Sequence, residues 1–183
     1  MKLRWAPVIV ALAIALGATA AYAAKIVVEA EHYKTIKPSM VKQTNSKASG
    51  KLCIGIPLRR PHAVEETGPA DTGYAEYKIS VSTSGLYQFW GRCRWYDACG
   101  NSFFILVDTK TTTSKTPYVT DQVFQKWHWV PGPKLRLSKG VHTIRIQNRE
   151  DGAQMDQWVL TTTPKNRWEP TRLEKETKKY ILK

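Results

Sequence analysis

The sequence has 183 residues, of which 28 are Lys or Arg and 15 are Asp or Glu, so its formal net charge is +13. This length suits one domain with its own hydrophobic core. Neither an internal repeat nor a Gly/Ser-rich linker divides the chain, which excludes a repeat array or a string of domains. The excess of positive charge favours acidic partners, among them anionic polysaccharide and an acidic protein surface, although it serves solubility equally well.

The N-terminus has the features of a secretory signal peptide. Lys2 and Arg4 precede an apolar run at residues 6–16, and residues 21–23 supply the small side chains of a cleavage site. The apolar run is shorter than the roughly 20 residues that a membrane-spanning helix needs, and no later stretch is long enough. We therefore predict that residues 1–23 are removed and that the protein is secreted or extracytoplasmic, in the periplasm or at the cell surface. Without Lys2 and Arg4, 26 basic residues stand against 15 acidic ones, a formal charge of +11.

Two polar stretches, residues 42–51 and 57–71, predict long surface connections. The second contains Arg59, Arg60 and His62, a basic group that could meet an anion or simply be solvated. Solvation is the simpler interpretation, because isolated charge runs commonly do no more than hold a loop in water.

Residues 73–108 form the centre of the predicted fold. Apolar and polar side chains alternate over residues 75–81, the period of a strand with one buried face, and Ser84-Gly85 predicts a turn. The next strand is expected from Leu86 to Trp95, and residues 103–107 are apolar throughout, as in a core strand. Together these segments predict an antiparallel β-core.

Further strands are expected at residues 134–137, 141–148 and 155–162, which brings the total to about nine or ten, the number of a two-sheet sandwich. Before them, Trp127 and Trp129 flank His128 and share one face if this segment is extended. One ring is expected in the core and the other at the rim, where a flat apolar face can stack on a sugar. The sequence does not assign the two roles.

Three cysteines allow at most one intramolecular disulfide. Cys93 alternates with Phe89 and Tyr87, so we expect it to point into the core as a free thiol. A Cys53–Cys99 bridge is then the favoured pairing, with Cys93–Cys99 as its rival. No CxxC motif indicates a metal or redox site.

Several short motifs stand in a definite order along the chain. They are Glu29-Ala30-Glu31, Tyr-x-Ile-x-Val-(x)3-Gly-x-Tyr-x-Phe-x-Gly-Arg at residues 77–92, Asn101-Ser102-Phe103-Phe104, Val107-Asp108, residues 140–146, residues 149–152 and Met155-Asp156. Over roughly residues 26–163 this order resembles the non-catalytic carbohydrate-binding modules of families 6 and 35.

The resemblance implies an all-β fold at residues 24–163, a jelly-roll β-sandwich of two antiparallel sheets of the galactose-binding-like type. Residues 164–183 fall outside the resembled pattern and form a basic C-terminal extension. Residues 171–183 are charged, with few apolar positions, and could form a short helix, a flexible arm, a docking extension or a frayed terminus.

Three carboxylates match a structural calcium site of the resembled families. Glu29 and Glu31 lie two residues apart on a strand and therefore face the same side, while Asp156 opens the last strand, which in the resembled fold lies close to the first. Such converging oxygen ligands suit Ca²⁺. The alternative is a set of surface carboxylates at strand ends.

The resemblance also implies a sugar-binding face of loop aromatics, amides and carboxylates. The matching candidates include Gln154, at a position where the family 6 pattern more often has Asn. The alternative is that Trp95 covers the core and Asn101 shapes a turn. The full set of candidates is Trp95, Tyr96, Asp97, Asn101, Trp127 and Gln154.

Two functions follow. We expect a secreted, lectin-like module that binds an extracellular or envelope polysaccharide, an acidic glycan among the candidates. The alternative is an accessory or structural subunit of an extracytoplasmic assembly that uses the sandwich for contact with an acidic protein. An enzyme is not expected, because no Ser/His/Asp ordering, HExxH, Gly-rich phosphate loop or haem motif appears, and we do not expect nucleic acid as the partner.

Overall fold

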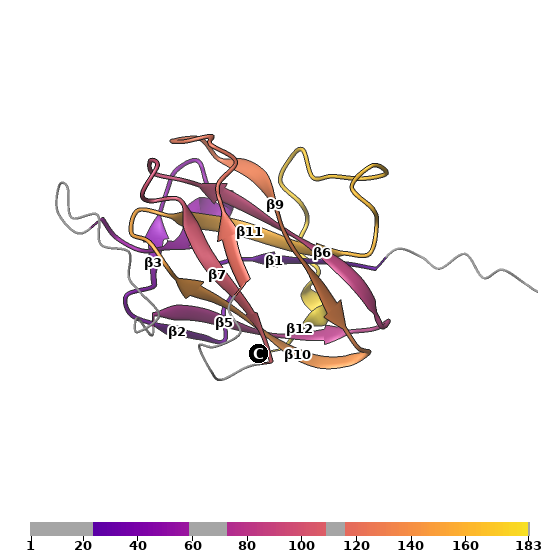
Figure 1. Ribbon diagram of the computed structural model, residues 1–183. Coiled ribbons are helices and arrows are strands. Elements are labelled where there is room, and N and C mark those ends of the chain that lie inside the picture. Colours follow the sequence, from indigo (N-terminus) through magenta and orange to yellow (C-terminus); the bar gives the residue numbers. More distant parts are fainter. Residues whose placement is uncertain (1–23, 59–72, 109–115, 183) are drawn as a thin grey trace, which may run out of the picture.

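The computed structural model describes residues 24–58, 73–108 and 116–182, and within these ranges the chain folds into two packed antiparallel β-sheets (Figure 1). The first sheet has the strand order β3-β4-β11-β6-β9, with β1 also paired to β11. Its strands are β1 (Lys25–Glu29), β3 (Val41–Thr44), β4 (Leu52–Gly55), β6 (Gly85–Arg94), β9 (His128–Leu137) and β11 (Gln154–Thr161).

The second sheet has the order β12-β5-β10-β7-β8, with β2 also paired to β5. Its strands are β2 (Thr35–Lys37), β5 (Tyr74–Val81), β7 (Ser102–Val107), β8 (Thr116–Val119), β10 (Gly140–Asn148) and β12 (Ile181–Leu182). The only helical elements in the described ranges are two 3₁₀ turns, η1 (Ser49–Lys51) and η3 (Lys178–Tyr180). The predicted all-β sandwich of two antiparallel sheets is confirmed.

The core lies between the sheets and follows the period-2 pattern of the sequence. In β5 the apolar members of the alternation, from Ala75 to Val81, are buried. The indole of Trp158 meets Tyr77 edge-on at 5.1 Å between ring centroids and stacks on Phe89 at 5.9 Å, which ties the two sheets together. Side chains of opposite parity on the first sheet therefore point away from the core, onto its outer face.

Strand β9 is longer than the sequence predicts, because it continues through Pro131 and Pro133. Among the described strands it lies at the edge of the first sheet and pairs with β6 alone, so the missing N–H groups of the prolines do not break a second ladder. Between them, a Cβ on Gly132 would lie 2.8 Å from the ring of Phe89, so only glycine allows the backbone to approach this closely.

The C-terminal extension docks on the sandwich. Its end adds β12 to the second sheet beside β5, and the Thr177 N–H donates to the Val27 carbonyl of the first sheet at 2.9 Å. Of the alternatives left open by the sequence, the docking extension is the one that the structure contains, and its helix is limited to the turn η3.

The cysteine prediction is half right. Cys93 is buried in the core with its thiol 3.6 Å from the Tyr118 hydroxyl, as its parity predicts. However, all three cysteines are free thiols, so the predicted Cys53–Cys99 bridge is wrong. Cys53 is buried in the middle of β4, with its thiol against the Gln43 carbonyl of β3, whereas Cys99 is exposed in the loop after β6.

The predicted signal peptide at residues 1–23 and the basic group of Arg59, Arg60 and His62 lie outside the described residues. Within the described part of the chain, no helix has the length and apolar character needed to cross a membrane.

Candidate functional site

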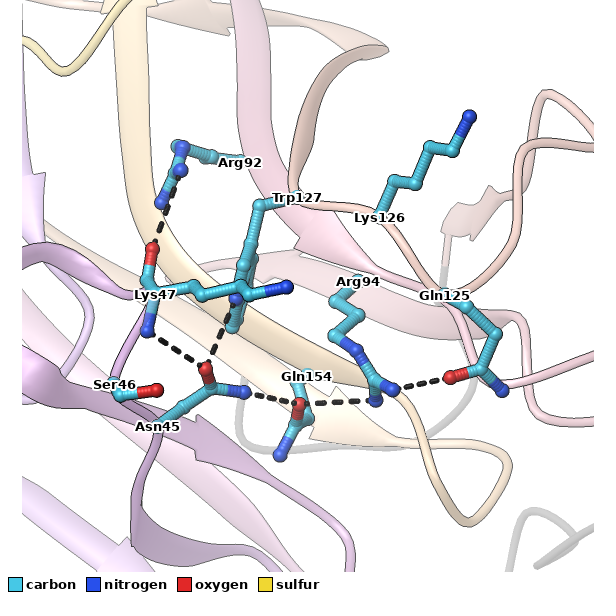
Figure 2. Close-up of a pocket in the computed structure, with 9 residues that line it drawn as sticks. All are labelled: Asn45, Ser46, Lys47, Arg92, Arg94, Gln125, Lys126, Trp127 and Gln154. Atoms are coloured by element: carbon cyan, nitrogen blue, oxygen red, sulfur yellow. Dashed lines mark hydrogen bonds between the residues drawn. The ribbon is translucent and has the colours of Figure 1, made fainter.

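A hollow of about 580 Å³ opens on the outer face of the first sheet, within the size range of small-molecule sites (Figure 2). Its floor carries Arg92 and Arg94 of β6 and Gln154 of β11, which point outward because they alternate with the core residues Cys93 and Met155. Two loops complete the lining with Asn45, Ser46 and Lys47 after β3, and Gln125, Lys126 and Trp127 before β9.

Trp127 stands at the middle of the hollow and is partly exposed. Its indole N–H donates to the Asn45 side-chain oxygen at 3.3 Å, and the Arg92 guanidinium lies 5.4 Å from the ring centroid. These contacts fix the ring from two sides, so it offers a positioned apolar surface next to polar groups.

The floor of the hollow is a network of amides around Arg94. Its guanidinium donates to the side-chain oxygens of Gln154, at 3.5 Å, and of Gln125. Gln154 in turn accepts from the Asn45 amide at 3.3 Å and donates to Gln43 at 2.7 Å. Among the described residues no carboxylate is paired with Arg94.

The charge of the hollow is positive. Four of its lining residues are basic and none is acidic: Lys47, Arg92, Arg94 and Lys126. Within the described residues, Arg92 is the one of these that pairs with an acid, Asp156. The other three have no ion pair with a described residue and leave a cationic surface around the Trp127 ring, which favours an anionic ligand.

Trp127 and Gln154, both predicted to bind a ligand, are brought together here. Trp95 is not. It is completely buried, with its ring 5.7 Å from those of Phe103 and Tyr118, so its predicted role as a ligand-facing ring is wrong. Trp95 directly follows β6 in extended conformation with the same parity as Cys93 and therefore enters the core with it.

Asp97 and Asn101 shape the loop after β6. The Asp97 carboxylate accepts from the N–H groups of Cys99 at 2.8 Å and Gly100 at 2.7 Å, and the Asn101 amide donates to the Ala98 carbonyl. These are turn-forming contacts, the alternative that the sequence left open for Asn101.

The loop after β6 still borders the hollow, through its contacts with Gln125. The Tyr96 carbonyl accepts from the side-chain amide of Gln125 at 2.6 Å, and Gln125 lines the hollow. Of the six predicted ligand residues, two therefore line the hollow, three belong to this neighbouring loop and one is core.

Seven lining residues were missed from the sequence: Asn45, Ser46, Lys47, Arg92, Arg94, Gln125 and Lys126. The two arginines could have been found, because the parity that sends Cys93 inward sends Arg92 and Arg94 to the same outer face. Asn45 and Gln125 come from loops far away in sequence and carry no local signal of a site.

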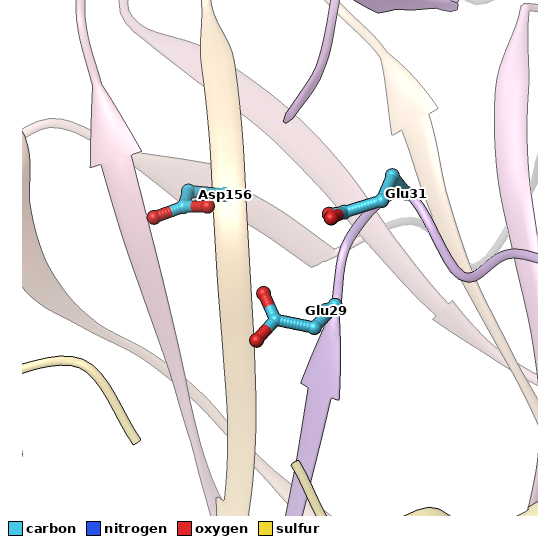
Figure 3. Close-up of side chains that lie close together, drawn as sticks. All are labelled: Glu29, Glu31 and Asp156. Atoms are coloured by element: carbon cyan, nitrogen blue, oxygen red, sulfur yellow. The ribbon is translucent and has the colours of Figure 1, made fainter. Parts of the chain in front are cut away.

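The carboxylates Glu29, Glu31 and Asp156, here called the acidic cluster, converge beside the hollow (Figure 3). One oxygen from each lies within 4.8 Å of the others. Asp156 is fully buried and accepts from the Ser49 N–H at 2.8 Å, while Glu29 accepts from Gln157 at 2.7 Å and from the Ser49 hydroxyl at 3.1 Å. The predicted convergence of these three residues is confirmed.

The electrostatics of the acidic cluster fit a cation. Burial raises the pKa of Glu31 to about 7, with a smaller contribution from the Glu29 charge. Burial also raises the pKa of Glu29 and, against the neighbouring Arg92, that of Asp156. The buried Oε2 atoms of Glu29 and Glu31 have no hydrogen-bond partner in the part of the chain that the structure describes, so hard oxygen ligands for a divalent ion are present.

A Ser/His/Asp group, not expected from the sequence, forms at the start of β10. The His142 Nδ1 lies 2.5 Å from Asp108, and its Nε2 lies 3.3 Å from the Ser138 hydroxyl. The same Nε2 is 2.9 Å from the Ser138 carbonyl, a contact that requires an N–H and leaves no lone pair to take a serine proton. Burial alone lowers the pKa of His142, but the bonds to Asp108 and the Ser138 carbonyl outweigh it and raise the pKa, so the group is a structural ion pair.

No protein-family model and no curated protein matches this chain. Solved structures do. The family 35 carbohydrate-binding module from Clostridium thermocellum aligns with a TM-score of 0.57 and 18% identity, covering 74% of this chain and 98% of that one. The fold is that of a family 6 or family 35 carbohydrate-binding module.

Two other structures show the range of the likeness. The family 6 module from Cellvibrio mixtus lichenase 5A, solved with cellotriose, has a TM-score of 0.54 and 14% identity, and the alignment covers 75% of this chain and 97% of that one. The Podospora anserina GH26-CBM35 mannanase has a TM-score of 0.57 and 16% identity, but this chain spans only 28% of it. The structures matched over nearly their whole length are thus binding modules, and the fold predicted from the motifs is confirmed.

Proposed function

We propose that this protein binds a carbohydrate without transforming it, and that the ligand is an acidic polysaccharide met outside the cytoplasm. The observation that supports this most strongly is the hollow on the first sheet, where Trp127 stands among amides and basic side chains with no acidic lining residue. The likeness to carbohydrate-binding modules supports the same class of ligand, and the predicted signal peptide supports the location.

Each part of the hollow has a role in this proposal. The Trp127 ring would stack on the apolar face of a sugar, with the neighbouring amides of Asn45 and Gln154 bonded to hydroxyl groups. Arg94, whose partners are two neutral amides, can exchange them for a sugar carboxylate and form a bidentate pair. The neutral amides would then hold the guanidinium in place before the ligand arrives.

We further propose that the acidic cluster holds Ca²⁺ in a structural role. Glu29, Glu31 and Asp156 would supply the oxygens, and the unpartnered Oε2 atoms of the two glutamates support this assignment. A bound ion would neutralise three carboxylates that are crowded together and stabilise the junction between β1 and β11.

A glycan array on residues 24–183, with and without calcium, tests the binding function. We expect retention on acidic glycans, and loss of at least about tenfold in affinity, or roughly 1.4 kcal/mol, in a Trp127→Ala variant. Trp127→Phe keeps an aromatic face and should retain most of the binding, while the exposed Val141→Ala on the opposite sheet is the unaffected control. An empty array would overturn the proposal.

The salt dependence of binding distinguishes carbohydrate binding from docking onto an acidic protein. Stacking does not depend on ionic strength, so moderate salt should weaken glycan retention only in part. Binding that disappears with salt but survives Trp127→Ala would instead support the assembly subunit, because exposed charges are screened over about 8 Å at physiological salt.

A further inference from the structure

One loop, here called the Trp127 loop and defined as residues 121–127, carries several of the side chains that line the hollow. Gln125, Lys126 and Trp127 belong to it, and it leads directly into β9, whose first residue is His128 (Figure 2). The aromatic ring of the hollow and one of its cations are thus placed by this loop. Their positions depend on the contacts that hold it.

The backbone of the Trp127 loop is strained at two residues. Gln122 has a φ of 69° and Gln125 a φ of 60°, in the left-handed region that residues other than glycine rarely adopt. Such a conformation persists where surrounding contacts fix it. At Gln125 the backbone N–H donates to the Trp95 carbonyl at 2.8 Å, and the side-chain amide donates to the Tyr96 carbonyl at 2.6 Å.

His128 holds the loop at both of its ends. The Nε2 atom of its ring lies 2.8 Å from the Asp121 carboxylate, and the Nδ1 atom lies 2.9 Å from the Lys126 carbonyl oxygen. That carbonyl belongs to the peptide bond that immediately precedes Trp127. One imidazole therefore joins the first residue of the Trp127 loop to the peptide bond beside the ring.

The two contacts of His128 together require a protonated ring. A backbone carbonyl and an ionised carboxylate can only accept hydrogen bonds, so each ring nitrogen must carry a hydrogen. A neutral imidazole has a single N–H and would turn a lone pair toward one of the two oxygens. Histidine is also the side chain that ordinarily changes its charge between pH 5 and 8.

The groups around His128 keep their charge over this pH range. Its register partner on β6 is Cys93, whose thiol lies 3.6 Å from the Tyr118 hydroxyl of β8. Burial, with a smaller contribution from the Asp121 charge, raises the pKa of both groups, so both stay neutral. The remaining charged neighbours are of residue types that do not titrate between pH 5 and 8: Asp121, Lys126 and Arg94.

We infer that His128 is a positioning residue of the hollow and makes binding of the acidic glycan depend on pH. While the imidazolium holds Asp121 and the Lys126 carbonyl, the Trp127 ring stands where the ligand meets it. Loss of the proton removes one of the contacts that fix the strained loop, so affinity falls as pH rises from 5 to 8. The carboxylates of the glycan stay ionised over this range and do not cause the change. This inference rests on the proposed function and adds the regulation of the same site.

The first test needs no ligand. NMR of ¹⁵N-labelled residues 24–183 between pH 5 and 8 follows the ring nitrogens of His128 and the indole N–H of Trp127, which Trp127→Phe assigns. We expect both ring nitrogens to be protonated at pH 5, and the Trp127 indole signal to shift with the same midpoint as the ring. A neutral ring at pH 5, or an indole signal that does not follow the His128 titration, overturns the inference.

The second test measures the affinity for oligogalacturonate by calorimetry at pH 5, 6.5 and 8. We expect binding about tenfold weaker at pH 8 than at pH 5, the size of effect that one hydrogen bond to a charged group produces. His128→Gln keeps a donor without the charge, so it should bind at every pH as weakly as the parent does at pH 8. His32→Gln is the matched control, because it removes a histidine–carboxylate pair of the same 2.8 Å length outside the hollow, and it should keep the parent's pH profile.

Asp121→Asn separates position from charge. It removes a negative charge near the hollow, so it would strengthen binding of an anion if charge alone governed the affinity. Positioning gives the opposite result, weaker binding at pH 5, because the imidazolium loses its partner. Stronger binding in Asp121→Asn, or an unchanged pH profile in His128→Gln, contradicts the inference.

Failure of the inference is distinguishable from failure of the proposed function. No binding at any pH together with an empty glycan array overturns the proposed function, whereas the NMR titration still decides whether His128 positions the Trp127 loop. If His128→Gln fails to fold, the titration of the parent and the direction of the Asp121→Asn effect decide.

Discussion

The outer face of the first sheet has two halves that differ in composition and in cover. One half carries the buried Trp90, Val27 and Val159 together with Trp129, and the C-terminal extension lies over it and packs Trp168 against this cluster (Figure 1). The other half carries Arg94, Gln154 and Trp127 and is open as the hollow. An apolar sheet face costs free energy when it is left in water, so it needs a cover, whereas a face of arginines and amides is stable when exposed and is free to bind.

The comparison also shows that three tryptophans with no distinguishing local sequence have different environments. Trp90 is 2% exposed beneath the extension, Trp95 is in the core, and Trp127 stands partly exposed in the hollow. Their roles follow from what lies over each ring. The following changes test that assignment, from the largest expected effect to the smallest.

Trp90→Ala should destabilise the fold, because it leaves a cavity beneath the extension. Buried tryptophan-to-alanine changes typically cost about 3–5 kcal/mol. Chemical denaturation measures the change in the free energy of unfolding. Trp127→Ala serves as the matched control. It should lose about 1 kcal/mol, the usual contribution of one hydrogen bond. Equal losses at the two positions would contradict the division of the face.

Calcium should stabilise the border between the halves, where the acidic cluster lies. If Glu29, Glu31 and Asp156 bind Ca²⁺, stability rises by about 2.7 kcal/mol at one hundred times the dissociation constant. EDTA should therefore lower the melting temperature, and a Glu31→Ala, Asp156→Ala double variant should lose the response. Glu169→Gln, an exposed carboxylate of the extension, should keep it. A melting temperature that changes with neither calcium nor EDTA would contradict the proposed metal site.

Arg94→Gln should weaken binding of an acidic glycan and leave binding of a neutral one nearly unchanged. Hydrogen bonds to charged groups contribute about 2 kcal/mol, which corresponds to roughly thirtyfold in affinity. Arg167→Gln removes the same charge from the covered half and should have little effect, since Arg167 is exposed there. Equal losses in the two variants would mean that only net charge attracts the ligand.

Stability should also depend on pH through His142, which lies outside both halves of the face. This contribution to the free energy of unfolding needs to be subtracted before the pH dependence of the outer face is interpreted. The folded-state pKa of His142 is raised above 6.5, so the folded protein holds this proton more tightly than the unfolded chain. The stabilisation is complete below pH 6.5 and is lost as pH rises through the folded-state pKa. Denaturation between pH 5 and 8 should show this decline together with that of Glu31, whose raised pKa of about 7 acts in the same direction, and Asp108→Asn should reduce the slope; an unchanged slope would place the titration elsewhere.

Much of the fold was predictable because local periodicity carries it. Alternation in β5 and β6 identified the inward residues correctly, and the motif order gave the sandwich. The same parity argument, applied to Trp95, would have sent it to the core with Cys93. The disulfide prediction failed because spacing along the chain does not reveal that Cys53 is enclosed between β3 and β11.

The sequence by itself determined the fold class, the inward parity of the central strands and the three carboxylates of the acidic cluster, because each depends on short-range alternation or on motifs at strand ends. The tertiary structure decided which tryptophan is available and that Asn45 and Gln125 line the hollow beside Arg94. Those relations join residues far apart in the chain through strand register and loop placement. No local pattern of side chains encodes which distant strand will become the neighbour.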